Sequence, residues 1–451
     1  MPSYFSCFGN HKPYKSCQAV AFACVIFVVA SCRTGYAIPV FARKYSLPCS
    51  ACHEAWPKLN SFGQNFKDNG YQLMNGKDSP VYQNASFWPV AMRVTPHWHD
   101  ESSGNVSVDS AHGPVEQTVK TSGFDLTGID ILAAGTISKN ISFLLVPSIE
   151  TDSGSVSFES ANVRFDNIRD STWLNFKFGK AELDLPLSEK RIPTLSNNGG
   201  AYQLYHFVPI GDVNATSPAD NQLGVELMGH SLDDRTRYAF SVVSSTDGNL
   251  GLPAGRSYDV YGHVSHAFEI QGLGLQRAGA YAYYGRQPTV FLTSGGEMIP
   301  GSGTGNKSFY RIGFYGNLYW DRFDLTGVFQ HASDDVFLGT GTAGDASLPP
   351  GARSPAWNTL TVEAHYTYNP QGFFIARYEL VRMSQQALAD SPSTLGDVDV
   401  FTVGCRLYPF INSRAGLAWH TEISTLRSRL TSNTHHDQRN NSIFTGLDFA
   451  F

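Results

Sequence analysis

Charged residues are scarce in this chain. Asp, Glu, Lys and Arg make up 16% of its 451 residues, whereas ordinary soluble domains contain about 25%. The formal net charge is −6, and nucleic-acid-binding domains instead carry an excess of Lys and Arg. The composition therefore argues against a soluble enzyme and against nucleic acid as a partner.

Long apolar runs are also rare. One short run, AVAFACVIFVVA, extends from Ala19 to Ala30, and it is too short to span a membrane as a helix. Lys12 and Lys15 precede it, and Gly35-Tyr36-Ala37 provides a small-residue cleavage site. Residues 1–37 are therefore predicted to be a secretory signal peptide. No later run of about 20 apolar residues predicts a transmembrane helix.

Cysteine is nearly absent from the mature chain. From Ile38 onward the sequence retains Cys49, Cys52 and Cys405, an odd number that excludes a disulfide framework of the kind found in small secreted domains. Cys405 lies in a strand-like stretch and is expected to be a small hydrophobic residue. In an alternative interpretation, Val29-Ala30-Ser31-Cys32 is a lipoprotein box, with Cys32 as a lipidated N-terminus.

The first two mature cysteines belong to the motif Cys49-Ser50-Ala51-Cys52-His53, which is the attachment signature of c-type haem. In such motifs the thiols bond covalently to the porphyrin edge and the histidine is the proximal axial ligand of the iron. A zinc site would need a second ligand pair, and a thioredoxin-like redox pair would lie in a βαβ context; the mature sequence has neither. The motif therefore predicts one covalent haem c on Cys49 and Cys52, with His53 on the iron.

The rest of the chain is rich in aromatic residues (13%) and contains 42 glycines. It offers segments of about ten residues with alternating apolarity, which is typical of strands of a transmembrane β-barrel. These segments predict an all-β fold, an antiparallel barrel of about sixteen strands over residues 86–451. The strands are expected near 86–98, 122–137, 141–151, 155–168, 171–180, 221–230, 236–244, 256–268, 274–286, 306–320, 323–333, 357–368, 371–383, 396–408, 412–425 and 441–451.

The connections and the last strand support a barrel. Tight turns, such as 138–140 and 321–322, alternate with long connections, among them 99–121 and 181–220, as in bacterial barrels with short periplasmic turns and long outer loops. Residues 201–210 would make the strand count odd, so they are assigned to a loop. The chain ends in alternating apolar residues and Phe451, which resembles a C-terminal signal for outer-membrane insertion. Both ends of an even-stranded barrel lie on the periplasmic side.

Alternation within the strands indicates which side chains face the lumen. Thr361, Glu363 and His365 oppose Leu360, Val362 and Ala364, and charges are costly on the lipid face. Met74 is the first candidate for the sixth iron ligand, since it is the single methionine of the haem segment; the inward residues His263, His365 and His420 compete with it. Inward arginines are candidates to pair with haem propionates: Arg93, Arg311, Arg377 and Arg414.

Residues 38–85 read as a monohaem cytochrome c segment. They contain FARKY at 41–45, the haem motif, PKLNSFG at 57–63 and NGY at 69–71, and they look like the haem segments of a group of monohaem proteins. The order of haem segment and barrel resembles the fused outer-membrane cytochrome–porins best known as iron oxidases. The resemblance implies haem at Cys49, Cys52 and His53, and it includes iron among the possible redox partners; nothing else is carried over residue by residue.

Two functions follow from these expectations. The first is electron transfer between a periplasmic carrier and an extracellular redox partner through one haem held at the barrel mouth. The second is a diffusion porin whose haem segment is a structural or regulatory plug. Electron transfer is favoured, because covalent haem is chiefly an electron carrier. A haem peroxidase would need a distal acid–base set, which the sequence does not reveal.

Overall fold

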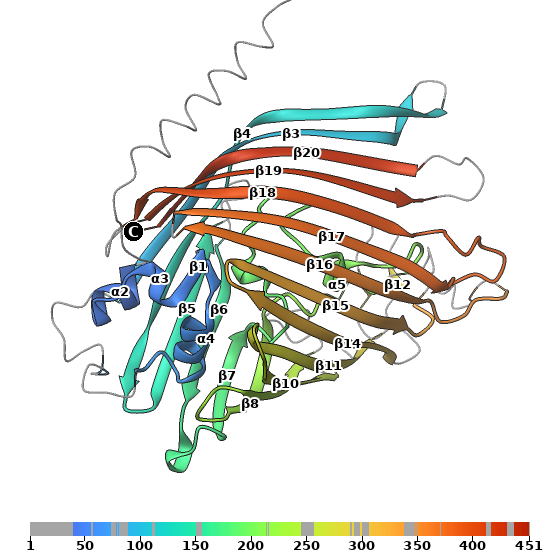
Figure 1. Ribbon diagram of the computed structural model, residues 1–451. Coiled ribbons are helices and arrows are strands. Elements are labelled where there is room, and N and C mark those ends of the chain that lie inside the picture. Colours follow the sequence, from blue (N-terminus) through green and yellow to red (C-terminus); the bar gives the residue numbers. More distant parts are fainter. Residues whose placement is uncertain are drawn as a thin grey trace, which may run out of the picture.

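A closed antiparallel barrel of sixteen strands dominates the computed structural model (Figure 1). Neighbouring strands follow each other along the chain, and β20 (Asp437–Ala450) pairs with β3 (Val90–Ser110) to close the ring. The structure describes residues 39–55, 57–73, 78, 80, 89–110, 113–149, 156–212, 214, 216–244, 257–288, 291–292, 298–299, 306–337, 348, 350–369, 371–411, 416–430 and 437–450. The predicted signal peptide, Cys32, Met74, Arg414 and Phe451 lie outside them.

All sixteen predicted strands are confirmed. Between β3 and β20 the wall consists of β4 (Gly113–Ser138), β5 (Ile141–Ile149), β6 (Val156–Phe165), β7 (Asn175–Ala181), β8 (Gln222–His230), β9 (Thr236–Ser244), β10 (Tyr258–Ile270), β11 (Gly274–Pro288), β14 (Asn306–Trp320), β15 (Phe323–Asp334), β16 (Ala356–Asn369), β17 (Gly372–Gln385), β18 (Val398–Ile411) and β19 (Gly416–Arg429). The two-residue strands β12 (Phe291–Leu292) and β13 (Met298–Ile299) pair outside the wall.

One predicted loop is wrong. Residues 99–121 were expected to be a long outer connection, but β3 and β4 pair through this stretch as far as Ser110 and Gly113. A hairpin that projects beyond the bilayer can pair its backbone without an apolar face. Its strands therefore lack the alternating apolar pattern, and polar residues such as Glu101 and Ser103 instead indicate a loop. Antiparallel pairing requires only that each backbone group meet its partner.

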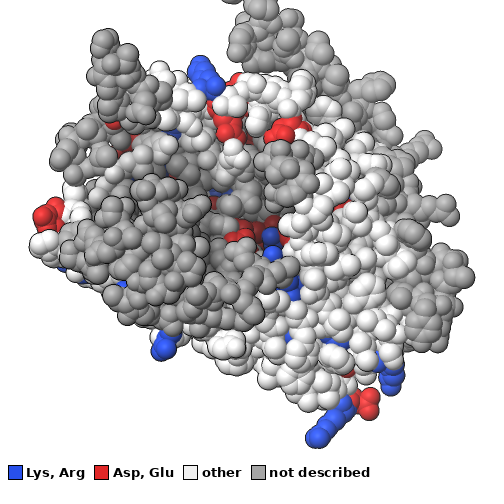
Figure 2. Space-filling view, turned by 180° about the vertical axis from the view of Figure 1, so that it is seen from behind, with Lys and Arg blue, Asp and Glu red and all other residues white. Residues whose placement is uncertain are grey.

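The two faces of the wall differ as the alternation predicted. On β16, Thr361, Glu363 and His365 are at most 2% exposed, whereas Leu360 is 36% exposed. On β20, Phe444 and Asp448 face inward and Ile443 outward. Over much of the surface in Figure 2 charged side chains are sparse, and they gather in a central hollow and near the rim. A closed barrel with an apolar exterior and a polar interior is an outer-membrane barrel, and the protein lies in the bacterial outer membrane.

Residues 39–73 form a small segment at one end of the barrel. It contains α2 (Pro39–Tyr45), α3 (Cys49–Cys52), β1 (His53–Ala55), β2 (Lys58–Leu59) and α4 (Ser61–Asp68). Figure 1 shows this segment at the end of the barrel where the C-terminal strand also ends. Short turns, including Asp233-Asp234 and Asp321-Arg322, lie at the same end, which is therefore the periplasmic end. No helix in the described ranges is long and apolar enough to cross a membrane.

A second segment, residues 182–221, folds into the lumen between β7 and β8. It contains the short helices η3 (Glu189–Arg191) and α5 (Gln203–His206). Inward residues of distant strands hold it: the Glu422 carboxylate accepts from Leu195 N at 2.7 Å, and Glu379 accepts from Gln203 N at 2.8 Å. Arg377 donates to Gly199 O at 2.6 Å. The prediction that residues 201–210 belong to a loop and not to the barrel wall is confirmed. Part of the polar lumen holds this segment by hydrogen bonds.

Candidate functional site

The haem motif forms a tight turn that is tied to the next helix. Asn60 is the N-cap of α4, since its Oδ1 accepts from Gly63 N at 2.9 Å. Its Nδ2 also donates to the carbonyl oxygens of Ser50 and Ala51, both at 3.1 Å. At Gly63, an added Cβ would lie 2.0 Å from the Cys52 carbonyl oxygen. Asn60 and Gly63 thus allow α4 to lie directly against the CxxCH turn.

His53 is held in the tautomer that a haem ligand needs. Its Nδ1 lies 3.1 Å from Pro57 O and 3.2 Å from Lys58 O. A carbonyl oxygen only accepts, so Nδ1 carries the proton and Nε2 keeps its lone pair. Burial lowers the pKa of His53 to about 4, so the imidazole is neutral at pH 7. Most metal-bound histidines are oriented in this way, by a hydrogen bond from the ring nitrogen that does not bind the metal.

The environment of Cys52 disfavours a redox or zinc function. The Cys52 thiol is free, and burial raises its pKa to about 11. Reactive cysteines instead have lowered pKa values, because the thiolate is the nucleophile and the metal ligand. A neutral thiol beside a neutral imidazole is compatible with the predicted thioether bond.

The motif residues outside CxxCH form a small aromatic core. Phe41 stacks on Tyr71 with ring centroids 4.9 Å apart and meets Phe66 edge-on at 5.1 Å. Tyr45 packs against Phe66 at 5.4 Å and donates to Tyr71 O at 2.9 Å. The FARKY and NGY sequences therefore pack α2 against the chain that follows α4.

The barrel wall anchors this segment from several sides. Lys44 donates to Thr136 on β4 at 3.1 Å, and Arg164 on β6 donates to the carbonyl oxygens of Lys67 and Asp68 at 2.6 and 2.9 Å. Arg237 on β9 pairs with Asp68 at 2.8 Å. Residues 39–73, the predicted haem segment, therefore lie inside the periplasmic mouth.

A cavity of about 290 Å³ lies between the haem segment and the wall, and both Cys52 and His53 line it. Much of its lining is apolar, and both sides contribute to it. The haem segment provides Val40, Phe41, Ala42, Leu59 and Phe66, and the wall provides Ala91, Leu132, Ala134, Leu144 and Val146. Inward apolar residues on β4 and β5 depart from the usual polar lumen, and they provide the apolar cover that a porphyrin needs.

The polar part of the same cavity is rich in basic side chains, each of which pairs with a carboxylate in or behind the lining. Six basic residues line it, against three acidic ones. Arg191 pairs with Glu182 at 2.6 Å and Lys190 with Glu159 at 2.7 Å. The six are Lys67, Arg93, Arg164, Lys177, Lys190 and Arg191. These side chains are suited to two haem propionates, because guanidinium and ammonium groups bind carboxylates by charge-assisted hydrogen bonds. The residues present therefore fit a haem.

Of the arginines predicted to meet propionates, Arg93 lines the cavity. Arg311 and Arg377 do not, which corrects that expectation: Arg311 pairs with Asp334 at 2.7 Å and Arg377 with Glu379 at 3.0 Å. The alternation of apolar and polar residues along the strands predicts that Arg311 and Arg377 face inward, but it does not predict where in the lumen they lie. The other five basic lining residues were not predicted: Lys67, Arg164, Lys177, Lys190 and Arg191. The inward apolar residues of β4 and β5 were the sequence signal that could have indicated this side of the barrel.

The histidines proposed as sixth ligands also lie elsewhere. Among the cavity-lining residues that the structure describes, His53 is the one histidine, and there is no methionine. His263 pairs with Asp184 at 2.8 Å, and His420 with Glu422 at 2.7 Å. His365 contacts Glu363 at 2.9 Å. Met74 therefore remains the predicted sixth ligand.

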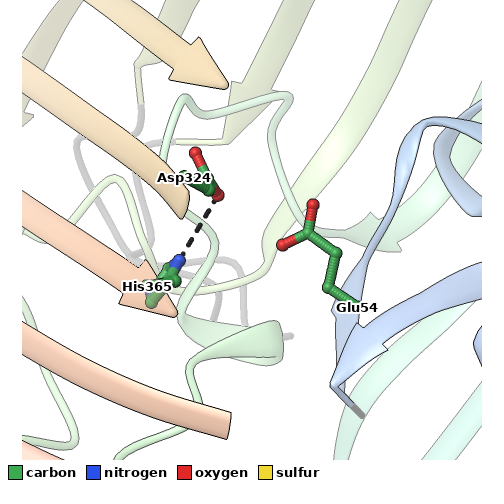
Figure 3. Close-up of side chains that lie close together, drawn as sticks. All are labelled: Glu54, Asp324 and His365. Carbon is green, nitrogen blue, oxygen red and sulfur yellow. Dashed lines mark hydrogen bonds and ion pairs between the residues drawn. The ribbon is translucent and has the colours of Figure 1, made fainter. Parts of the chain in front are cut away.

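A second cavity, of about 920 Å³, lies on the other side of α4 and reaches the periplasmic turns. Leu59, Lys67 and Arg191 line both cavities. Asp324 on β15 and His365 on β16 project into the second cavity and lie 3.3 Å apart. Figure 3 shows Glu54, from the haem segment, directed toward this pair.

No protein-family model matches the chain, and no curated protein matches its sequence. Solved porins are similar in structure. An anion-selective porin from Comamonas acidovorans has a TM-score of 0.47 at 12% identity, covering 80% of this chain and 99% of that one. The outer membrane channel DcaP of Acinetobacter baumannii has a TM-score of 0.48 at 10% identity, and the match covers 80% of this chain and 97% of that one.

The assignment of the fold rests on the closed hydrogen-bond ladder and the two faces of the wall rather than on these similarities. The even strand number, the short turns at one end and the apolar exterior define a porin-like outer-membrane β-barrel.

Proposed function

We propose that this protein is an outer-membrane c-type cytochrome fused to a porin-like barrel, which transfers electrons between periplasmic and extracellular partners through one covalent haem. The observation that carries the proposal is the cavity that Cys52 and His53 share between the haem segment and the wall. Apolar walls, basic side chains and a neutral imidazole with its Nδ1 hydrogen-bonded meet there.

Haem supplies one-electron redox chemistry when it is bound. The residues of the chain bind and orient it. His53 would be the iron ligand, because its Nδ1 hydrogen bonds leave the Nε2 lone pair free. Phe66 and the inward residues Leu132 and Val146 line the cavity and would exclude water from a bound porphyrin. Lys190 and Arg191, which pair with Glu159 and Glu182, would hold the propionates.

The lumenal segment 182–221 favours this proposal over a diffusion porin. Tyr202 donates to Glu363 at 2.8 Å, Gln330 donates to Leu204 O at 2.7 Å, and Arg406 donates to Pro193 O at 2.7 Å. These contacts span strands β15 to β18. A segment held so firmly across the lumen restricts solutes, whereas electron transfer requires no aqueous path.

The second candidate is a diffusion porin with the haem segment as a structural or regulatory plug. The cavity of about 920 Å³ that reaches the periplasmic turns supports it, because it leaves part of the mouth open beside the plug.

Replacing His53 by alanine tests the haem ligation directly. The purified wild-type protein should show a haem absorbance spectrum that changes reversibly between ascorbate or dithionite and ferricyanide. The His53→Ala variant should lose the wild-type spectrum, because the proximal ligand sets the iron's electronic state. His263→Ala is the matched control, since His263 faces the other cavity, and its spectrum should be unchanged. A His53→Ala spectrum identical to that of the wild type would exclude His53 as the ligand.

Planar-bilayer conductance separates the two candidates. The wild-type protein should conduct poorly, and replacement of residues 188–207 by a Gly-Ser linker should raise single-channel conductance at least about tenfold, since sixteen-stranded barrels enclose an aqueous channel when the lumen is clear. Heat-modifiable gel migration confirms that the variant barrel is folded. Equally high conductance of both proteins would favour the diffusion porin.

A further inference from the structure

We propose that Glu54, Asp324 and His365 form a binding site for a divalent first-row transition-metal ion at the junction of the haem segment and the barrel. One ligand atom from each residue lies within 4.8 Å of the others. Two carboxylates and one imidazole are a ligand set that such ions accept. The inference does not depend on the proposed electron transfer or on the haem.

The imidazole of His365 presents the correct nitrogen. The Lys58 ammonium, which can only donate, contacts His365 Nδ1, so Nε2 carries the proton; Nε2 lies 2.9 Å from Glu363 Oε1 but has no hydrogen-bond partner in the described part of the chain. Nδ1 therefore has the lone pair, and it faces Asp324 Oδ2 at 3.3 Å (Figure 3). A carboxylate on the far nitrogen is the usual support of a metal-bound histidine, where it fixes the ring and raises its basicity.

The carboxylate of Asp324 has unused coordinating capacity. Asp324 is 5% exposed, and within the described part of the chain its Oδ1 has no hydrogen-bond partner. A buried polar atom without a partner costs free energy. A bound ion would satisfy this oxygen, and the adjoining cavity of about 920 Å³ provides a path for entry from the periplasmic side.

A cationic group of the protein already lies at the centre of the cluster. The Lys58 ammonium pairs with Glu54 at 3.1 Å and also contacts Asp324 and His365. These are the three residues of the proposed site, so Lys58 marks the position that a cation takes. Metal binding must displace this ammonium, and Lys58 and the metal therefore compete.

The site joins two parts of the fold. Glu54 follows His53 in the haem segment, whereas Asp324 and His365 belong to β15 and β16. A bound ion would fasten the haem segment to the wall more rigidly than the flexible Lys58 side chain does.

Calorimetric titration of the full-length protein in detergent with Zn²⁺, and absorbance titration with Co²⁺, test the site. The wild type should bind one ion, with cobalt ligand-field bands. Asp324→Asn combined with His365→Ala should abolish binding, and Glu363→Gln should weaken affinity about tenfold through loss of the supporting carboxylate. Lys58→Met should tighten affinity by removing the competitor.

Asp184→Asn combined with His263→Ala is the matched control, because this carboxylate–imidazole pair also faces the same cavity; the affinity of this variant for the ion should equal that of the wild type. Equal affinity in the Asp324→Asn/His365→Ala variant, or binding detectable in Lys58→Met alone, would overturn the proposal for the native protein. Haem content, measured in the same samples, shows separately whether the haem proposal holds.

Discussion

Replacing both Cys49 and Cys52 by alanine should remove all covalently bound haem from the protein. Thioether bonds survive denaturation, so wild-type protein should give a haem-stained band on a denaturing gel. The double variant should give none, because the motif contains both predicted attachment thiols and the cavity residues alone would hold the group non-covalently.

Cys405→Ala is the matched control for this experiment. Cys405 is the other free cysteine in the described part of the chain and lies on β18, far along the sequence from the haem motif. Its haem stain should equal that of the wild type. Staining of the double variant at the wild-type intensity would show that haem c is not attached at this motif.

The sequence predicted the barrel well because lipid imposes a strict rule on each strand. Residues such as Leu360 and Glu363 must point to opposite faces, and charges are excluded from the outer face near the midplane. Where the hairpin of β3 and β4 leaves the bilayer, the rule no longer applies, and the prediction placed a loop at 99–121.

The site was only partly predictable. Cys49, Cys52 and His53 are recognisable because their chemistry lies in five consecutive residues. The basic side of the cavity is assembled from β3, β6 and β7 and from the lumenal segment, and Arg164 or Arg191 meets the haem segment only after the barrel closes. The inward fold of residues 182–221 likewise depends on Glu363, Glu379 and Glu422, which lie far away in sequence.

The second prediction with a large expected effect is that the protein transports electrons, and not solutes, across the membrane. The hydrocarbon core is about 30 Å thick, so a haem free in the periplasm could not exchange electrons with an external partner. Several anchors instead hold the haem segment inside the mouth, including Lys44 to Thr136 and Arg237 to Asp68. The proposed function requires that an external partner reach this haem through the barrel, and it therefore predicts that the protein carries electrons across an otherwise insulating bilayer.

Reconstitution into liposomes that enclose an oxidant dye tests this claim most directly. An external, membrane-impermeant reductant should reduce the enclosed dye through the wild-type protein, while the dye and the reductant stay on their own sides. The His53→Ala variant, with its barrel confirmed as folded by heat-modifiable migration, should leave the dye oxidised. Equal dye reduction by both proteins would mean that the barrel passes small molecules and that the haem carries no electrons across the membrane.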